Sequence, residues 1–267
     1  MASSTSAKKD PILLDPLPNP GESLERQRDD ILYERMMPWL VVMVMVVAFV
    51  IHEWIAYLFH SPRSPVLSLI VAATVIAIGI WKITKAIADL RNVKLGLRGE
   101  KAVGQFIEVV RAAGYFVLHD LIDRRSDGSE YNVDHVLIGP GGIFVLETKT
   151  RSKPARGDAI VRYDGDRVSV DGGPWDEEPV RQVKAAVSTV RRILEETTGR
   201  ADIPIRPVLL FPGWFIEGTS SGKLVWVLEP KALPKWLPYE PTKLSLEDAA
   251  LFHHRLSSHI RQNRKQK

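Results

Sequence analysis

The chain has 267 residues, of which 45% are hydrophobic and 25% are charged, a balance that excludes wholesale disorder and collagen-like repeats. It contains no cysteine, which excludes disulfide scaffolds, thiolate metal sites, iron–sulfur clusters and cysteine nucleophiles. The formal net charge of +4 is smaller than is usual for a chain that wraps nucleic acid by charge alone.

Residues 1–35 are expected to form a polar N-terminal arm. Residues 1–30 are rich in proline and have too few spaced apolar residues to pack, which predicts disorder with helix forming only near residues 24–35. The arm lacks the apolar segment and the small-residue cleavage site of a signal peptide.

Two apolar segments occupy residues 36–85, at about 38–59 and 65–83. Twenty helical residues rise about 30 Å, which is the thickness of a bilayer core. A short linker containing Pro62 and Pro65 separates the segments. They therefore predict a two-helix transmembrane hairpin, and a pair of buried soluble helices is the alternative.

The basic residues near the ends of these segments predict their orientation. The connecting loop offers only Arg63, whereas basic residues cluster on the other side of both segments. By the positive-inside rule, both termini and everything after residue 95 are expected in the cytoplasm, in a multi-pass protein of the plasma (inner) membrane. The clustered residues are Arg26, Arg28, Arg35, Lys82, Lys85, Arg91, Lys94, Arg98 and Lys101.

The remaining residues alternate helix and strand signals without an internal repeat, which predicts a mixed α/β fold with a central sheet flanked by helices. Ser245 and Asp248 bracket the start of the last helix in the manner of a capping box. Helices are predicted over 98–113, 179–197 and 246–262. Strands are predicted over 115–121, 205–211 and 223–228, with hairpins over 131–149 and near 160–171.

The hairpin at residues 131–149 carries the most informative residues. Two apolar strands flank the turn Gly139-Pro140-Gly141-Gly142, and pairing of Ile138 with Ile143 places Asp134 opposite Glu147. Directly opposed side chains share a face of the sheet, with Cβ atoms about 5 Å apart. Lys149 lies two residues beyond Glu147 and projects from the same face.

Two opposed carboxylates destabilise a sheet unless something neutralises them. A divalent cation does so, and oxygen ligands of this kind suit Mg²⁺ or Mn²⁺. We therefore predict a metal site at Asp134 and Glu147, with the Lys149 ammonium steadying an attacking water and the charge on a phosphoryl oxygen. A solvated strand face is the structural alternative for the Glu-x-Lys sequence.

Two further polar residues are expected near this site. Glu100 lies on the helical stripe of Val103, Ile107 and Val110, which should face the core. Gln182 lies beside the apolar edge of its helix. A metal ligand or a water-orienting group would explain polar atoms at such positions. Alternatively, Glu100 favours the positive end of its helix dipole, Gln182 is structural, and His135 points to the opposite face for packing.

These motifs, in this order, resemble the nuclease-related domain (NERD) family over about residues 96–215. The resemblance rests on Gly96-Leu97-Arg98-Gly99-Glu100, Tyr115 to Leu121, Asp134-His135-Val136, Gly139-Pro140, Gly142-Ile143-Phe144, Glu147-Thr148-Lys149, Gly157, Ile160, Gly165 and Pro179-Val180-Arg181-Gln182-Val183.

The resemblance implies a restriction-endonuclease-like fold of the PD-(D/E)xK type over residues 96–215. Residues 216–267 are expected to form a C-terminal strand and helix extension that packs on it. It implies catalytic positions for Asp134, Glu147 and Lys149, with Glu100 and Gln182 in the flanking motifs. One departure is Glu178, because family members often carry Asn at that position before the proline.

Basic residues follow the hairpin and are predicted to bind nucleic acid. Arg151, Lys153 and Arg156 come directly after Lys149 and can hold phosphates beside the metal; a solvated loop is the alternative. The expected function is a membrane-anchored, Mg²⁺- or Mn²⁺-dependent nuclease, with DNA favoured over RNA as the substrate. The alternatives are a non-catalytic module that binds nucleic acid or protein at the membrane, and a structural anchor with a degenerate domain.

Overall fold

The computed structural model describes residues 16–59, 66–124, 130–153, 159–218 and 224–265. The first fifteen residues of the predicted polar arm lie outside this range. The chain divides into two units, one formed by Glu22–Arg98 and the other by Met1–Gly21 together with Gly99–Lys267. Each unit is described by itself.

The Glu22–Arg98 unit is helical. It contains α1 (Glu22–Asp30), a single π-helical segment η1 (Ile31–Met36), α2 (Met37–Leu58) and the first two thirds of α3 (Val66–Ala112). The sequence predicted a second span over 65–83 and a separate helix from residue 98. The structure has one continuous helix instead, because no proline interrupts Val66–Ala112 and single glycines are tolerated inside a helix.

Packing within this unit is concentrated at one end of its helices. Ile31, Ala86, Leu90 and Val93 form a small buried cluster, and Arg35 pairs with Asp89 at 2.6 Å. Elsewhere the apolar side chains of α2 and early α3 are largely uncovered by protein, as Val44 illustrates with 69% of its surface exposed. Both helical stretches are long and apolar enough to cross a membrane.

The second unit is built on a five-stranded mixed sheet. Its strands are β1 (Phe116–Arg124), β2 (Glu130–Gly139), β3 (Gly142–Thr148), β6 (Ile205–Leu210) and β8 (Trp226–Leu228), in the order β1-β2-β3-β6-β8. The first three strands are antiparallel, whereas β6 and β8 run parallel to β3. The carboxyl ends of β3, β6 and β8 therefore lie at one edge of the sheet.

The predicted alignment of the β2–β3 hairpin is confirmed. Ile138 pairs with Ile143 and the register continues to His135 opposite Leu146. The predicted four-residue turn is shorter in the structure, because Gly139 pairs with Gly142 and leaves a two-residue loop. Gly142 has φ +123°, and a Cβ at this position would stand 2.8 Å from the carbonyl oxygen of Pro204, so only glycine fits.

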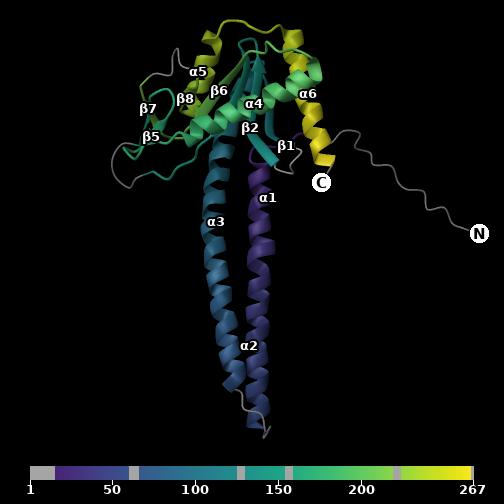
Figure 1. Ribbon diagram of the computed structural model, residues 1–267, viewed down its shortest axis with the longest axis vertical. Helices are drawn as coiled ribbons and strands as arrows, with labels where there is room; N and C mark the ends of the chain where they lie inside the picture. Colours follow the sequence, from purple (N-terminus) through teal and green to yellow (C-terminus); the bar gives the residue numbers. More distant parts are fainter. Residues whose placement is uncertain (1–15, 60–65, 125–129, 154–158, 219–223, 266–267) are drawn as a thin grey trace, which may run out of the picture. The chain divides into compact units, whose positions relative to one another are not determined.

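Helices cover both faces of this sheet. Figure 1 shows α4 (Glu178–Thr198) and α6 (Leu246–Lys265) together over one face, where they enclose Val136, Ile143 and Val145. The other face packs on Val103, Ile107 and Val110 of α3, as predicted, and on the segment η2–α5–η3. These elements run over Pro230–Ala232, Leu233–Trp236 and Leu237–Tyr239. The predicted mixed sheet flanked by helices is thus confirmed.

A second, three-stranded sheet was not predicted. It contains β4 (Ile160–Tyr163) and β5 (Val168–Val170), which are the predicted hairpin near 160–171, and adds β7 (Phe215–Glu217) parallel to β4. Strand β7 has only three residues, so its sequence is too short to show a strand pattern. The predicted strand over 223–228 is also shorter, because β8 begins at Trp226.

Candidate active site

The two hairpin carboxylates converge where β3 ends. Glu147 is the second-last residue of β3, and the register next to His135–Leu146 brings Asp134 alongside it. Asp134 Oδ2 accepts a hydrogen bond of 2.7 Å from the backbone N–H of Thr148. The Asp134 side chain therefore reaches across the hairpin to β3 beside Glu147.

Lys149 links this carboxylate pair to helix α4. Its Nζ donates to Glu147 Oε1 at 2.6 Å and also to Gln182 Oε1. Gln182 is placed by Tyr131, whose hydroxyl donates to the Gln182 carbonyl oxygen at 2.7 Å. Four of the five sequence-predicted catalytic residues are thus joined by direct contacts or by adjacent strands.

Glu178 holds the Gln182 amide in this arrangement. Gln182 Nε2 donates to Glu178 Oε1 at 2.8 Å, one helical turn earlier. Glu178 also pairs with Arg181, and these two donors hold the pKa of the Glu178 carboxyl below its ordinary value. The residue that departs from the family pattern therefore orients the glutamine that contacts Lys149.

Glu100 lies buried on α3 with 6% of its surface exposed. Its Oε2 has no hydrogen-bond partner among the described residues. Packing against the site is close here, because a Cβ on the preceding Gly99 would stand 1.7 Å from Thr150 Oγ1. Gly99 therefore allows the chain after Lys149 to lie directly against this turn of α3.

The acidic residues repel one another. Burial raises the pKa of Glu100 to about 8, with further increases from the charges of Asp120 and Glu147 and a decrease from a hydrogen bond with Gly21. Desolvation raises the pKa of Asp134 well above its ordinary value, and the charges of Glu147 and Glu100 raise it further. Such shifts are frequent where carboxylates are arranged for chemistry.

Sequence reasoning missed Asp120, which joins this acidic group from β1. It is 1% exposed and accepts a hydrogen bond of 3.2 Å from Asn132 Nδ2. Its φ of +46° is uncommon for a residue other than glycine, and it interrupts the alternation of β1, because Leu118 and Leu121 pack on the same face. A carboxylate between the apolar pairs Val117-Leu118 and Leu121-Ile122 was the signal available in the sequence.

His135 packs on the other side of its strand, as its position predicted. It is fully buried, and its Nδ1 lies 2.9 Å from Nδ1 of His119. Burial lowers the pKa of both imidazoles, to about 4 for His119.

The predicted nucleic-acid-binding residues are only partly described. Arg151 and Lys153 are exposed in the segment that follows β3. A Cβ on Gly213 would stand 3.2 Å from Lys153 Nζ, so this lysine lies over the chain that follows β6. Arg156, like Gly157 of the resemblance, falls outside the described residues.

The donor set at the hairpin suits a hard divalent cation. Asp134 and Glu147 offer carboxylate oxygens side by side, and the partnerless Oε2 of Glu100 is an orphaned buried acceptor near them. Within the part of the chain that the structure describes, no group of three or more acidic or histidine side chains is arranged as a metal site. The proposed fit of a divalent cation therefore rests on the carboxylates of Asp134 and Glu147.

The second unit is an α/β domain with a mixed sheet flanked by helices. Residues 95–212 match the family model described as Nuclease-related domain, NERD. The matched residues include Glu100, Asp134, Glu147, Lys149 and Gln182. Neither the comparison with curated proteins nor that with solved structures gives a match. This part of the chain is therefore similar to a nuclease-related domain.

Proposed function

We propose that the chain is a membrane-anchored, divalent-metal-dependent nuclease of the PD-(D/E)xK type that hydrolyses phosphodiester bonds. The observation that carries this proposal is the convergence of Asp134, Glu147 and Lys149 at the end of one hairpin within a nuclease-related domain. Mutually repelling carboxylates at a sheet edge destabilise the fold, and a functional requirement for a cation explains why they are retained.

Asp134 and Glu147 would hold Mg²⁺ or Mn²⁺. Such an ion, when bound, polarises a phosphoryl oxygen and lowers the pKa of bound water. Because the pKa of Asp134 is raised in the metal-free site, this carboxyl must lose its proton to become a ligand. The affinity for the cation should therefore increase with pH.

Lys149 would position the attacking water and offset charge that develops on the phosphoryl group. The Lys149 ammonium donates to both Glu147 and Gln182, and these two hydrogen bonds fix the position of its flexible side chain. Gln182, held by Glu178, orients Lys149. The Oε2 atom of Glu100, which has no partner among the described residues, would contact the cation or a water. Arg151 and Lys153 would contact flanking phosphates, with DNA as the favoured substrate.

The two apolar helices would anchor the enzyme in a bilayer. Leucine, valine and isoleucine side chains cover α2 and early α3 without protein around them, and burying such surface is favourable by about 25 cal/mol per Å². The loop between the helices carries only Arg63, whereas basic residues flank their other ends. The nuclease-related domain and both termini would then face the cytoplasm, at the plasma (inner) membrane.

A non-catalytic binding module is the second candidate. It is favoured by the ion pair between Lys149 and Glu147, which satisfies one carboxylate oxygen without a metal. In that case the domain would bind nucleic acid or a protein at the membrane without cleaving a bond.

Cleavage by the full-length chain in detergent micelles separates these candidates. With Mg²⁺ or Mn²⁺ the wild type should cut DNA or RNA, EDTA should stop the reaction, and Glu147→Gln should lower the rate by at least about 100-fold. Glu247→Gln is the matched control, because Glu247 is exposed in the first turn of α6. Nucleic-acid binding without metal-dependent cleavage would instead establish the binding module.

A further inference from the structure

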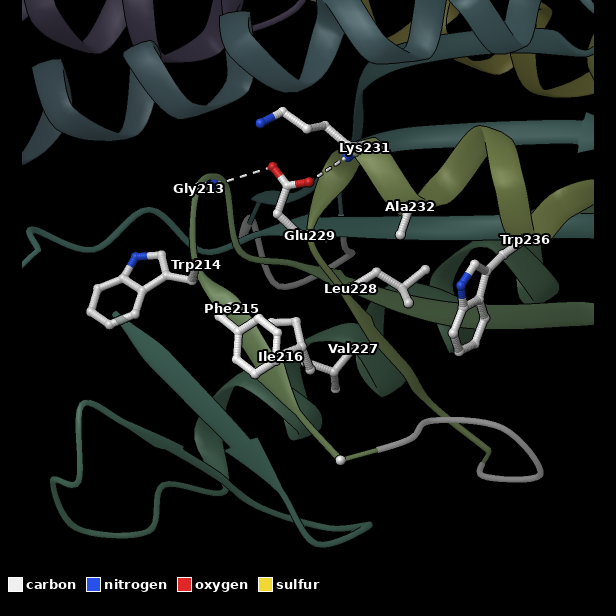
Figure 2. A pocket seen from close by; sticks show the side chains of 11 residues that line it. Gly213, Trp214, Phe215, Ile216, Val227, Leu228, Glu229, Lys231, Ala232 and Trp236 are labelled. Atoms are coloured by element: carbon white, nitrogen blue, oxygen red, sulfur yellow. Dashed lines mark hydrogen bonds between the residues drawn. The ribbon is translucent and has the colours of Figure 1, made fainter. Parts of the chain in front are cut away.

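A cavity of about 490 Å³ lies beyond the carboxylates at the same edge of the sheet. Its lining comes from β7, from the end of β8 and from the η2–α5 segment. Figure 2 shows Phe215 and Trp236 on opposite sides of Leu228, with the Glu229 carboxylate above them. The volume is within the range of sites that hold small organic groups.

The parallel strands place this cavity next to the proposed catalytic residues. Thr148 pairs with Leu210, and Leu210 pairs with Leu228, at the carboxyl ends of three adjacent strands. Two strand spacings amount to about 10 Å, which separates the end of β3 from the end of β8. A nucleic acid whose phosphodiester lies at Glu147 therefore extends naturally toward the cavity.

Lys153 lies beside the first cavity. It lines a second cavity of about 420 Å³ together with Ala159, Ile160, Gly213 and Phe215. Gly213 and Phe215 line both cavities. The exposed ammonium of Lys153, four residues after Lys149, can therefore hold a phosphate near Phe215.

The lining of the first cavity suits a neutral ring. Phe215 presents an aromatic face with 66% of its surface exposed, although it lies in a strand whose next residue, Ile216, packs inward. The carboxylate of Glu229 is fixed by the backbone N–H of Lys231 at 2.9 Å, and because both residues line the cavity, their opposite charges balance. An aromatic lining of balanced charge, with the Lys153 ammonium beside it, matches a base whose phosphate lies outside the cavity.

We propose that this cavity binds an unpaired nucleobase, stacked on Phe215, while Lys153 holds the phosphate between that base and the scissile bond. The proposal rests on the proposed nuclease function and names its substrate class as single-stranded or locally unpaired nucleic acid. A paired base cannot enter, because its edge and both faces are occupied in the duplex.

The test measures binding by the full-length chain in detergent micelles, with EDTA present so that no bond is cut. The probes are a single-stranded DNA oligonucleotide containing 2-aminopurine and the same oligonucleotide in a duplex. Phe215→Ala removes the stacking face, and Phe215→Trp keeps one. Tyr239→Ala is the matched control, because Tyr239 is an aromatic residue that is 89% exposed and lines neither cavity.

Stacking on an aromatic side chain predicts that Phe215→Ala weakens single-strand affinity by about fivefold or more and abolishes quenching of 2-aminopurine. Phe215→Trp should retain both, Tyr239→Ala should match the wild type, and duplex affinity should not change. Lys153→Gln should weaken binding and lower the salt slope by about one.

Two results would overturn the proposal: single-strand binding by Phe215→Ala at wild-type affinity, or an equal loss for single strand and duplex. The outcome is independent of cleavage. A Phe215 effect on binding in a chain that cuts nothing would support the base site and refute the nuclease. Cleavage that Glu147→Gln abolishes, with no effect of Phe215→Ala on binding, would support the nuclease and refute the base site.

Discussion

Many large apolar side chains of α2 and early α3 are exposed, whereas most of those in the central sheet of the α/β unit are buried. Phe49 on α2 has 56% of its surface exposed, whereas Phe144 on β3 has none. Valine shows the same contrast, with Val47 45% exposed and Val145 fully buried. A chain folded wholly in water is expected to bury both sets, so this difference supports the proposal that the first unit enters a membrane.

The largest expected difference is between alanine substitutions of Phe144 and of Phe49. Phe144→Ala should lower the free energy of unfolding by about 3–5 kcal/mol, because it empties a close-packed core. That corresponds to a loss of roughly 6–20 °C in Tm. Phe49→Ala should change the Tm by less than about 2 °C, because its ring does not contribute to a protein core.

Thermal unfolding of both variants, followed by tryptophan fluorescence in the same micelles, measures this difference. Equal losses for Phe49→Ala and Phe144→Ala would contradict the contrast, since they would place Phe49 in a protein core as well.

A charge in the middle of α2 tests more directly whether this helix spans a membrane. Val47→Arg should reduce the fraction of chain that stays in membranes after alkaline carbonate extraction, because arginine at the centre of a spanning helix costs about 2.5–3.5 kcal/mol. Val47→Leu is the control and should remain inserted. A wild-type chain found in the soluble fraction, with Val47→Arg unaffected, would indicate a soluble helix pair.

The acidic site predicts a dependence of stability on pH. Burial raises the pKa of Glu100 from 4.5 to about 8, so the folded chain holds this proton more tightly than the unfolded chain does. The resulting stabilisation is complete below pH 4.5 and is lost as the pH rises through about 8. Its slope is about 1.4 kcal/mol per pH unit within this window.

Glu100→Gln should lessen this dependence, because the amide does not ionise, and the raised pKa of Asp134 should account for part of what remains. The measurement is the Tm of the metal-free wild type and of Glu100→Gln at several pH values between 5 and about 9. Glu247→Gln, on an exposed part of α6, should follow the wild type. Parallel curves for the wild type and Glu100→Gln would mean that the folded structure does not raise the pKa of Glu100.

The sequence was sufficient for features that depend on local patterns. Alternating apolar residues around Gly139 to Gly142 determined the register that aligns Asp134 with β3, and the stripe of Val103, Ile107 and Val110 determined which side of α3 faces the core. Both follow from the periods of strand and helix, which are independent of the rest of the chain.

Features that depend on tertiary contacts were not accessible in the same way. Asp120 enters the site through a left-handed backbone conformation, which no spacing rule anticipates. Strand β7 exists because its three residues pair with β4, more than fifty positions earlier. The contact of Glu178 with Gln182 could have been predicted from the sequence, since residues four apart on a helix are neighbours.

The central claim is that the hairpin carboxylates bind a divalent cation. Titration of the full-length chain with Mn²⁺, with the free ion counted by electron paramagnetic resonance, tests it without requiring activity. Asp134→Asn keeps an acceptor for the Thr148 N–H and removes only the charge. The account predicts that this substitution weakens Mn²⁺ binding by at least about tenfold, the loss typical even of an outer-sphere substitution. Equal Mn²⁺ affinity in the wild type and Asp134→Asn would contradict it.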